Sequence, residues 1–204
     1  VKTDLDRLLR YHVDRIDENN KAPAVYEFGM IDKSGVVRNM LNHVVVIPGT
    51  AKSVISLVDI TDRKKAEEAL IRSENMYRAI FENTGNATIL IEEDMTISLV
   101  NTQWVNLSGY SKEEQEGKKK WTEFVVPEDL ERMVRYHKKC RETEGNAPWM
   151  YEFHYRSRSG EIRNIIVHVV LIPGTKRSIA SLLDITERKK AEQALKESEQ
   201  LLSS

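Results

Sequence analysis

Apolar residues recur along the chain at two different spacings, which predict a mixture of helices and strands. Steps of three and four residues, the spacing of one helix face, run through 66–81 and again through 187–202. Alternation at every second position, the spacing of a strand, marks 161–172. Both faces of that strand are largely apolar. We therefore expect one face to cover the core and the other to need a helix or a partner chain.

Turn residues and shorter apolar runs predict the other elements. Pro127 at a first turn, followed by Glu128 and Asp129, favours the start of a long helix. Pro173-Gly174 fits the centre of a type II turn, where glycine supplies the positive φ. The predicted order is two strands, short helices, a long helix and three strands, at 87–91, 96–100, 102–117, 127–143, 149–156, 161–172 and 178–185.

An internal repeat organises the chain. When the sequence is shifted by 125 residues, residues 2–74 align with residues 127–199 without a gap and agree at 37 of 73 positions. Such agreement indicates a duplication. The first copy lacks counterparts of residues 76–126, and we expect these to lie before Val1.

The repeat predicts four parts in this chain. They are the C-terminal part of a first domain (1–60), a connector helix (61–81), a complete second domain (82–186) and an output helix (187–204). In the first domain, the strand at 53–60 should have an unpaired edge, because its neighbour belongs to the missing half. Such an edge invites pairing with another chain, so we expect disorder, dimerisation or strand exchange there.

Composition and charge exclude several classes of protein. The 31 basic residues balance 32 acidic ones, which gives no electrostatic case for a nucleic-acid or membrane surface. No window reaches the roughly 18 apolar residues of a membrane helix, and the chain opens without the apolar run of a signal peptide. We expect a cytoplasmic location, although a parent protein can be anchored to a membrane elsewhere. Cys140 is the single cysteine, which excludes a disulfide framework and a cysteine-based zinc site.

Catalytic motifs are absent from the sequence. It has no glycine-rich phosphate loop, no nucleotide-binding boxes of a kinase, no phosphoacceptor histidine motif and no nucleophile elbow. It also has no cluster of metal ligands. We therefore expect this segment not to be an enzyme and to hold no metal.

Four segments resemble, in order and at similar spacing, those of the PAS domain family. They read NTQWVNLSGYSKEEQEG from Asn101, VPEDLERM from Val126, YEFHYRSRSGEIRN from Tyr151 and DITERKKAEQAL from Asp184. The resemblance implies an α+β fold, with a five-stranded antiparallel sheet of strand order B-A-I-H-G and helices on one face. A partial second copy and connecting amphipathic helices complete the expected architecture.

The resemblance also implies a sensory role in signal transduction, with a sensor histidine kinase as the commonest parent protein. In this interpretation the segment responds to a small ligand, a redox state or a partner, and relays the change through the Asp-Ile-Thr junction to the output helix. One alternative is a ligand-free spacer and dimerisation module. Another is the input module of a cyclase or a transcription regulator.

Several partners follow from these interpretations. We expect a homodimer through the connector and output helices, a downstream kinase or other output domain, and a small-molecule ligand. We expect no nucleic acid and no membrane contact in this segment.

The strongest candidate positions lie where a strand meets the following helix. Asp184 and Thr186, with their copies Asp59 and Thr61, can cap the helix through side-chain oxygens. The family resemblance adds that this motif couples the sheet to the output helix. Plain capping is the alternative interpretation.

Aromatic side chains of the complete copy suggest a ligand pocket. The candidate lining residues are Trp104, Trp121, Tyr151, Phe153 and His168. The alternative is that these side chains are ordinary core. We expect neither haem nor flavin, because His137 lies in a strongly basic segment without a second ligand, and Cys140 lacks the Asn-Cys-Arg-Phe surroundings of flavin-binding light sensors.

Overall fold

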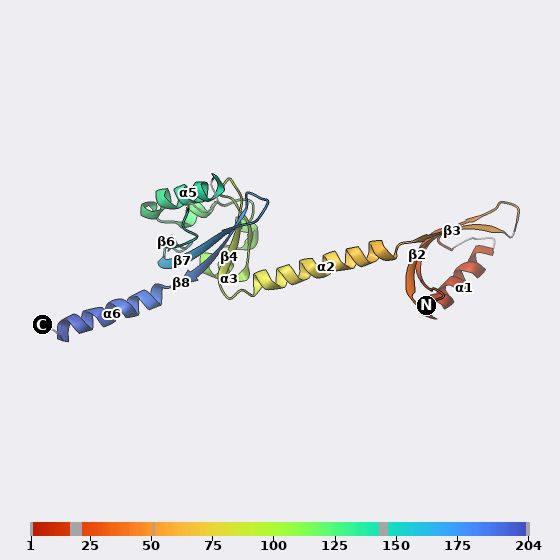
Figure 1. Ribbon diagram of the computed structural model, residues 1–204, viewed down its shortest axis with the longest axis horizontal. Coiled ribbons are helices and arrows are strands. Elements are labelled where there is room, and N and C mark those ends of the chain that lie inside the picture. Colours follow the sequence, from red (N-terminus) through yellow and green to blue (C-terminus); the bar gives the residue numbers. More distant parts are fainter. Residues whose placement is uncertain (1, 17–21, 51, 143–146, 203–204) are drawn as a thin grey trace. The chain divides into compact units, whose positions relative to one another are not determined.

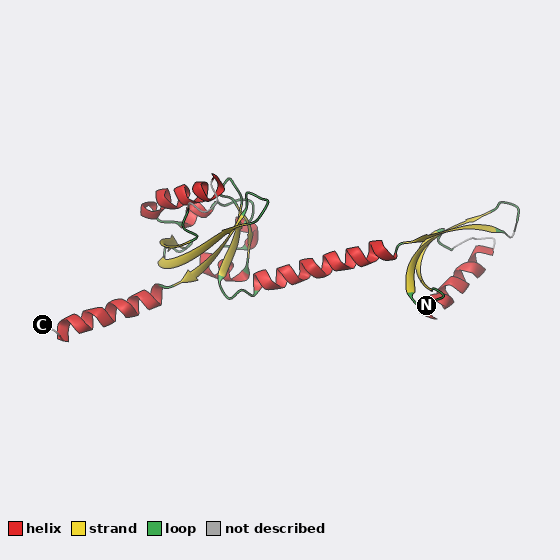
Figure 2. Cartoon of the chain, in the orientation of Figure 1, coloured by secondary structure: helices red, strands yellow, loops and turns green. Residues whose placement is uncertain are grey.

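Both parts of the molecule combine strands with helices, which confirms the α+β class (Figures 1 and 2). The computed structural model describes residues 2–16, 22–50, 52–142 and 147–202. The chain divides into two compact units, 1–76 and 77–204. The division falls inside one helix, α2 (Thr61–Glu82).

The first unit contains a three-stranded antiparallel sheet with one helix before it. Helix α1 (Lys2–Ile16) precedes β1 (Val25–Ile31), β2 (Val37–Val46) and β3 (Ser53–Asp59). The sheet has the order β1-β2-β3, so among the described residues β3 pairs on one side only. Every residue of β3 is exposed. Within the described part of the chain, the second edge of β3 is therefore unpaired, as the sequence predicts.

The second unit contains a five-stranded antiparallel sheet. Its first half comprises β4 (Ala87–Ile91), β5 (Ile97–Val100), α3 (Thr102–Ser108), α4 (Lys112–Gln115) and the 3-10 helix η1 (Trp121–Phe124). Its second half comprises α5 (Pro127–Glu142), β6 (Met150–Arg156), β7 (Ile162–Leu171), β8 (Ser178–Asp184) and α6 (Thr186–Leu202). The strand order is β5-β4-β8-β7-β6, which is B-A-I-H-G in the lettering used above, so the predicted topology is confirmed.

The core of the second unit lies on one face of this sheet. Trp104 of α3, Phe124 of η1 and Met133 of α5 are buried in the same cluster as Ile165 and Val167 of β7. Helices therefore cover that face, as expected. The opposite face carries exposed apolar side chains of β7 and β8, namely Ile162, Val170, Ile179 and Leu183.

Local capping explains where the short helices begin and end. Asn101 caps α3, and α3 ends at Gly109, whose φ of 75° lies in the left-handed region that glycine tolerates. Ser111 and Glu114 form a reciprocal capping box at the start of α4. These caps therefore explain why residues 102–117 form short helices, as the sequence predicts, and not one long helix.

The turn between β7 and β8 has the predicted geometry. Gly174 has a φ of 74°, and the Thr175 amide donates to the Ile172 carbonyl across the turn. The observed strands are one residue shorter at some ends than predicted, because ladder pairing stops before the turn and before the following helix. The predicted 161–172 is observed as Ile162–Leu171.

The duplication is preserved in the strand register. Met40 pairs with Asp59 in the first unit, and their copies Ile165 and Asp184 pair in the second. Because the register is the same, a residue and its copy occupy equivalent places in the two sheets.

Candidate functional site

Two kinds of site are not found among the residues that the structure describes. No helix in these ranges is long and apolar enough to cross a bilayer. No group of three or more His, Cys, Asp or Glu side chains is placed to hold a metal ion. Polar contacts of the second unit instead concentrate at helix ends and around one cavity.

Four residues where β8 meets α6 form what we call the second junction: Arg163, Asn164, Asp184 and Thr186. Asp184 Oδ1 accepts a hydrogen bond from the Thr186 backbone amide at 2.9 Å, and so caps the first turn of α6. Thr186 Oγ1 accepts from the Asn164 backbone amide at 2.9 Å. Arg163 Nη1 donates to Asp184 Oδ2 at 3.2 Å. The start of α6 is therefore bound to β7 through two side chains.

The first copy repeats this geometry at the start of α2, in a first junction of Arg38, Asn39, Asp59 and Thr61. Asp59 Oδ1 accepts from the Thr61 amide at 2.9 Å, and Thr61 Oγ1 accepts from the Asn39 amide at 2.8 Å. Arg38 Nη1 donates to Asp59 Oδ2 at 2.9 Å. The two copies agree at only about half of their aligned positions, yet they make the same hydrogen bonds here. The junction is therefore a feature of both copies.

Hydrogen bonding lowers the pKa of both junction aspartates. Donation from the Thr61 hydroxyl and amide, together with Arg38, lowers the pKa of Asp59 to about 2. Burial acts to raise the pKa of Asp184, but hydrogen bonds from Thr186 and Arg163 outweigh it and lower that pKa. Both carboxylates are therefore charged at neutral pH.

Sequence reasoning identified half of each junction. The two aspartates cap their helices, as expected, whereas the two threonine oxygens accept from a neighbouring strand instead of from the helix. The Arg-Asn pairs at 38–39 and 163–164 were missed. Their identity in both copies was a signal for them, because the aligned register places each pair beside its aspartate and threonine.

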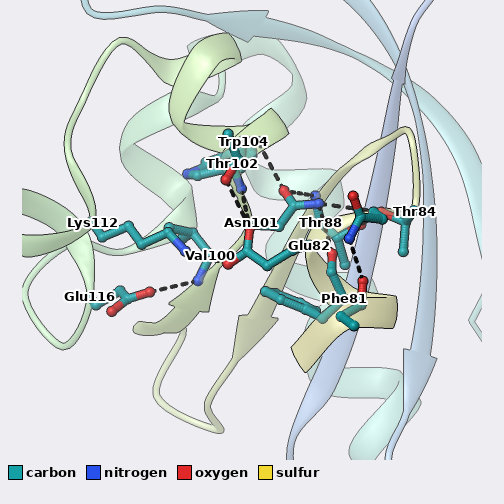
Figure 3. Close-up of polar contacts among 12 residues, drawn as sticks. Phe81, Glu82, Thr84, Thr88, Val100, Asn101, Thr102, Trp104, Lys112 and Glu116 are labelled. Carbon is teal, nitrogen blue, oxygen red and sulfur yellow. Dashed lines mark hydrogen bonds and ion pairs between the residues drawn. The ribbon is translucent and has the colours of Figure 1, made fainter. Parts of the chain in front are cut away.

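Asn101 joins the last turn of α2 to β4 and α3 within the second unit (Figure 3). Its Oδ1 accepts from the backbone amides of Thr88 and Trp104, both at 2.9 Å. Its Nδ2 donates to the carbonyls of Phe81 at 3.1 Å and Asn86 at 2.9 Å. The side chain is fully buried, so one amide group satisfies backbone atoms of α2, β4 and α3 together.

Glu82, the last residue of α2, makes a second set of contacts there (Figure 3). Its Oε2 accepts from the Thr102 amide at 2.9 Å and from the Thr102 hydroxyl at 2.8 Å. Its Oε1 contacts Lys112 Nζ at 2.5 Å. Sequence analysis quoted Asn101 only as the start of a motif and did not assign this role to either residue.

A cavity of about 530 Å³ lies on the inner side of the sheet, within the size range of small-molecule sites. It is lined by residues of β4, α3, η1, α5, β6, β7 and β8. The structure brings all five predicted pocket residues to its wall: Trp104, Trp121, Tyr151, Phe153 and His168. Several are also buried core, so the two interpretations of these side chains are compatible.

His137 of α5 lines the cavity with both ring nitrogens in contact with protein atoms. Its Nε2 lies 3.0 Å from the Glu93 carbonyl, and Arg141 Nη1 lies 3.0 Å from its Nδ1. Burial, with the nearby Arg141, lowers the pKa of His137 and favours the neutral ring. Burial also raises the pKa of Tyr151 to about 12. The wall of the cavity is therefore uncharged at these positions.

Comparison with known families agrees with this architecture. The model of a family described as PAS fold matches residues 97–186, from β5 to the first residue of α6. A curated relative from Methanosarcina acetivorans, named a methyl sulfide methyltransferase-associated sensor, is 35% identical over 133 residues. That match covers 64% of this chain and 13% of the relative, so the chain spans only a small part of that protein.

Solved structures similar to this chain include two PAS or sensory-box proteins. One is the PAS domain of an HTR-like protein from Haloarcula marismortui, with 24% identity, a TM-score of 0.49, and coverage of 60% of this chain and 99% of that one. Another is a sensory box histidine kinase/response regulator from Burkholderia thailandensis, with 21% identity, a TM-score of 0.47, and coverage of 62% and 97%. From the strand order and the match at 97–186, this chain contains a domain that belongs to the PAS fold family.

Proposed function

We propose that this chain is the sensory relay segment of a signal-transduction protein, in which a change in the cavity alters the second junction and, through it, helix α6. The observation that carries the proposal is the repeated junction. In both copies the same four residue types bind a helix start to the sheet with nearly equal distances.

The path from cavity to junction is short and runs along β7. Val167, His168 and Val169 of this strand line the cavity, and Arg163 and Asn164 of the same strand hold the start of α6. A ligand that shifts the strand wall therefore acts on the junction directly. Such a ligand must have different affinities for two states of the segment, because a ligand with equal affinity shifts no equilibrium.

The output of the whole protein is proposed to be a histidine kinase. Support comes from the resemblance of the segment at 184–195 to the output helices of such kinases, and from the curated relative that is named a sensor. If the output domain is instead that of a cyclase or a transcription regulator, the proposed relay is the same. The proposal involves no resident haem or flavin. Both nitrogens of the His137 ring, the histidine considered as a haem ligand, contact protein atoms.

A second copy of this chain is the proposed partner of α2 and α6. Ala66, Leu70, Ser73, Tyr77 and Ile80 repeat at steps of four and three residues, and α6 repeats the first of these as Ala191, Leu195 and Ser198. This is the spacing of a coiled-coil seam. Leu70, Tyr77, Ile80 and Leu195 are exposed, so each helix offers an apolar stripe to a partner.

Sedimentation analysis tests this partner. Leu70→Asp places a charge on the seam and should weaken the dimer at least about tenfold. Asn75→Asp adds the same charge on the opposite side of α2 and should leave the dimer intact. Equal dissociation constants for the two variants would exclude a seam through α2.

Hydrogen-exchange mass spectrometry tests the relay itself. Ala180 lines the cavity on β8, and Ala180→Leu fills part of it. We expect the amides of 186–195 to change their exchange rates by about threefold or more, because the wall presses on the junction. The amides of 61–70, which follow the first junction, are the internal control and should not change. Unchanged exchange at 186–195 in a folded variant would contradict the relay.

The junction is tested by Asp184→Asn with Glu187→Gln as its matched control. Both remove one negative charge near the start of α6, but only Asp184 contacts Arg163 and the Thr186 amide. We expect faster exchange in the first turn of α6 for the Asp184 variant alone. If the two variants change exchange in the first turn of α6 equally, Asp184 acts through its charge near the positive end of the helix dipole and not through its contacts in the junction.

A further inference from the structure

The cavity of the second unit is walled by side chains without a permanent charge. Among the described residues that line it, none is Asp, Glu, Lys or Arg. Most are aliphatic or aromatic, and they include Ile89 and Ile91 of β4 and Leu182 of β8. An ion in such surroundings loses its hydration without gaining a counter-charge, which is strongly unfavourable.

A guanidinium group behind the wall, that of Arg141, is already occupied. Its Nη1 donates to the His137 carbonyl at 2.8 Å, and its Nη2 donates to Ser178 Oγ at 2.9 Å. Its Nε donates to the Lys176 carbonyl at 3.0 Å. An anionic ligand would have to break this set of contacts to reach the charge, so Arg141 does not make the cavity an anion site.

Polar groups of the wall are also largely satisfied within the protein. Trp104 Nε1 donates to Gln115 Oε1 at 2.6 Å, and Ser178 Oγ accepts from Arg141. His137 contacts Glu93 and Arg141 through its two nitrogens. These groups hold the shape of the cavity and are not available to a ligand without rearrangement.

Two buried donors of the wall have no such partner. Trp121 is 7% exposed and Tyr155 is 0% exposed, and both line the cavity. Neither Trp121 Nε1 nor the Tyr155 hydroxyl has a hydrogen-bond partner in the described protein. A buried donor without an acceptor has lost its hydrogen bonds to water without replacement, so an acceptor brought by a ligand recovers that loss.

Building on the proposed sensory role, we propose that the cavity binds an uncharged, mainly apolar molecule that carries a carbonyl or similar acceptor oxygen, received by Trp121 Nε1 or the Tyr155 hydroxyl. The apolar body of the ligand replaces water against the aliphatic and aromatic wall. The single acceptor oxygen then fixes the orientation of the ligand in the cavity. A ketone, an ester or an amide fits this description, whereas a carboxylate or an ammonium ion does not.

Three probes of one skeleton separate these properties by isothermal titration calorimetry on the whole chain. They are 2-acetylnaphthalene, with a carbonyl; 2-ethylnaphthalene, of similar shape without an acceptor; and 2-naphthoate, with a negative charge. We expect the ketone to bind at least about fivefold more tightly than the hydrocarbon and at least about tenfold more tightly than the carboxylate. Ala180→Leu should weaken all three if they bind in the cavity.

Tyr155→Phe and Trp121→Phe test the two donors. Tyr155→Phe removes only the hydroxyl, and should leave the free protein as stable as before or more stable, since an unpaired donor is gone. Loss of the ketone's preference over the hydrocarbon in either variant supports the proposal and identifies the donor. Retention of that preference in both variants overturns the assignment of donors.

The outcomes also separate this inference from the sensory role. Tighter binding of the carboxylate than of the ketone overturns the ligand class but leaves a ligand-responsive cavity. Binding that Ala180→Leu leaves unchanged in all three probes overturns the cavity as the site. Failure of every probe to bind overturns the ligand class, and the exchange experiment on 186–195 still decides the relay.

Discussion

The two copies of the repeat agree in the polar contacts that hold their helices to the sheet and differ in the surroundings of their apolar side chains. In the second unit, Asp129 of α5 accepts from the His154 amide of β6 at 2.8 Å, and Arg132 donates to the Glu152 carbonyl at 2.9 Å. The first unit has the same pair of contacts between α1 and β1: Asp4 accepts from the Gly29 amide, and Arg7 donates to the Glu27 carbonyl. The helix before the strands is thus held to the sheet in the same way twice.

The apolar side chains of the two copies have different surroundings. Leu57 of β3 is 50% exposed, whereas its copy Leu182 of β8 is 5% exposed. Beside Leu182 in the sheet lies Ala87 of β4, a strand for which the first unit has no counterpart among the described residues. The difference shows that register and helix junctions arise within the repeated segment, while the closed core requires the residues from β4 to η1.

The largest expected effect follows from removing a core side chain without a counterpart among the described residues of the first copy. Trp104 is 1% exposed and contacts the rings of Phe124 and Tyr155. Trp104→Ala should reduce the stability of the second unit by about 3–5 kcal/mol, because it leaves a large cavity. Peptide-resolved hydrogen exchange across 162–171 in increasing urea measures this.

Leu57→Ala in the first unit is the comparison. Its side chain is half exposed, so we expect a loss of less than about 1 kcal/mol, measured by exchange across 37–46. Similar losses from the two substitutions would mean that the first copy is closed by a core of its own, and the contrast between the copies would be wrong.

Exchanging one inner-face residue between the copies sharpens the comparison. Asn42 and its copy Val167 occupy the same buried place on β2 and β7. Val167→Asn should cost the second unit about 2 kcal/mol, because an amide enters an apolar wall. Asn42→Val should change the first unit by about 1 kcal/mol or less, since Asn42 Oδ1 lacks a partner but its Nδ2 donates to the Tyr26 hydroxyl.

Urea denaturation of the two single variants and of the double variant measures these effects. The unit that is not substituted is the control in each case. If Val167→Asn is neutral, the inner face of the second unit tolerates polarity, and the apolar cavity described above loses its physical basis.

A smaller effect is expected from acid at the first junction. The pKa of Asp59 lies at about 2 in the folded chain, below its usual range near 4 in an unfolded one. A depressed folded pKa adds stability that is present above pH 4 and is lost as the pH falls towards 2. We therefore expect the first turn of α2 to loosen over this window.

Carbon-detected NMR titration of the Asp59 carboxylate measures this pKa directly. Asp59→Asn should remove the pH dependence of the first turn of α2 between pH 4 and 2. Titration of Asp59 near pH 4 instead would show that its contacts with Thr61 and Arg38 are not maintained in solution.

Much of the fold was predictable because the repeat and the periodicity report local structure. The strands at 150–156, 162–171 and 178–184 follow alternation, and their antiparallel register follows from the turns at Gly160 and Gly174. The junction aspartates were also readable, because a helix cap depends on residues close in sequence.

Other features depended on contacts between residues far apart in sequence. Whether an aromatic side chain lines a cavity or fills it depends on how α5 and β7 are spaced, and single-residue patterns do not encode that distance. That Trp121 Nε1 lacks a hydrogen-bond partner among the described residues also depends on how distant elements pack around it, which the sequence pattern does not encode. Glu82 reads as one of many acidic residues on an amphipathic helix, and its bonds to Thr102 appear only when β5 and α3 are in place.

Helix α2 is continuous from the first junction to the residues that contact Asn101 and Thr102, so a change in its length is also a change in rotation about its own axis. Each inserted residue turns the helix residues after it by about 100° around the helix axis. Insertion of seven residues nearly restores the original angle, whereas insertion of two turns the following residues to the far side. A series of such insertions between Glu68 and Asn75 would therefore vary the rotation of the later helix residues relative to the earlier ones. The number of inserted residues sets that rotation, and no side-chain contact has to be substituted.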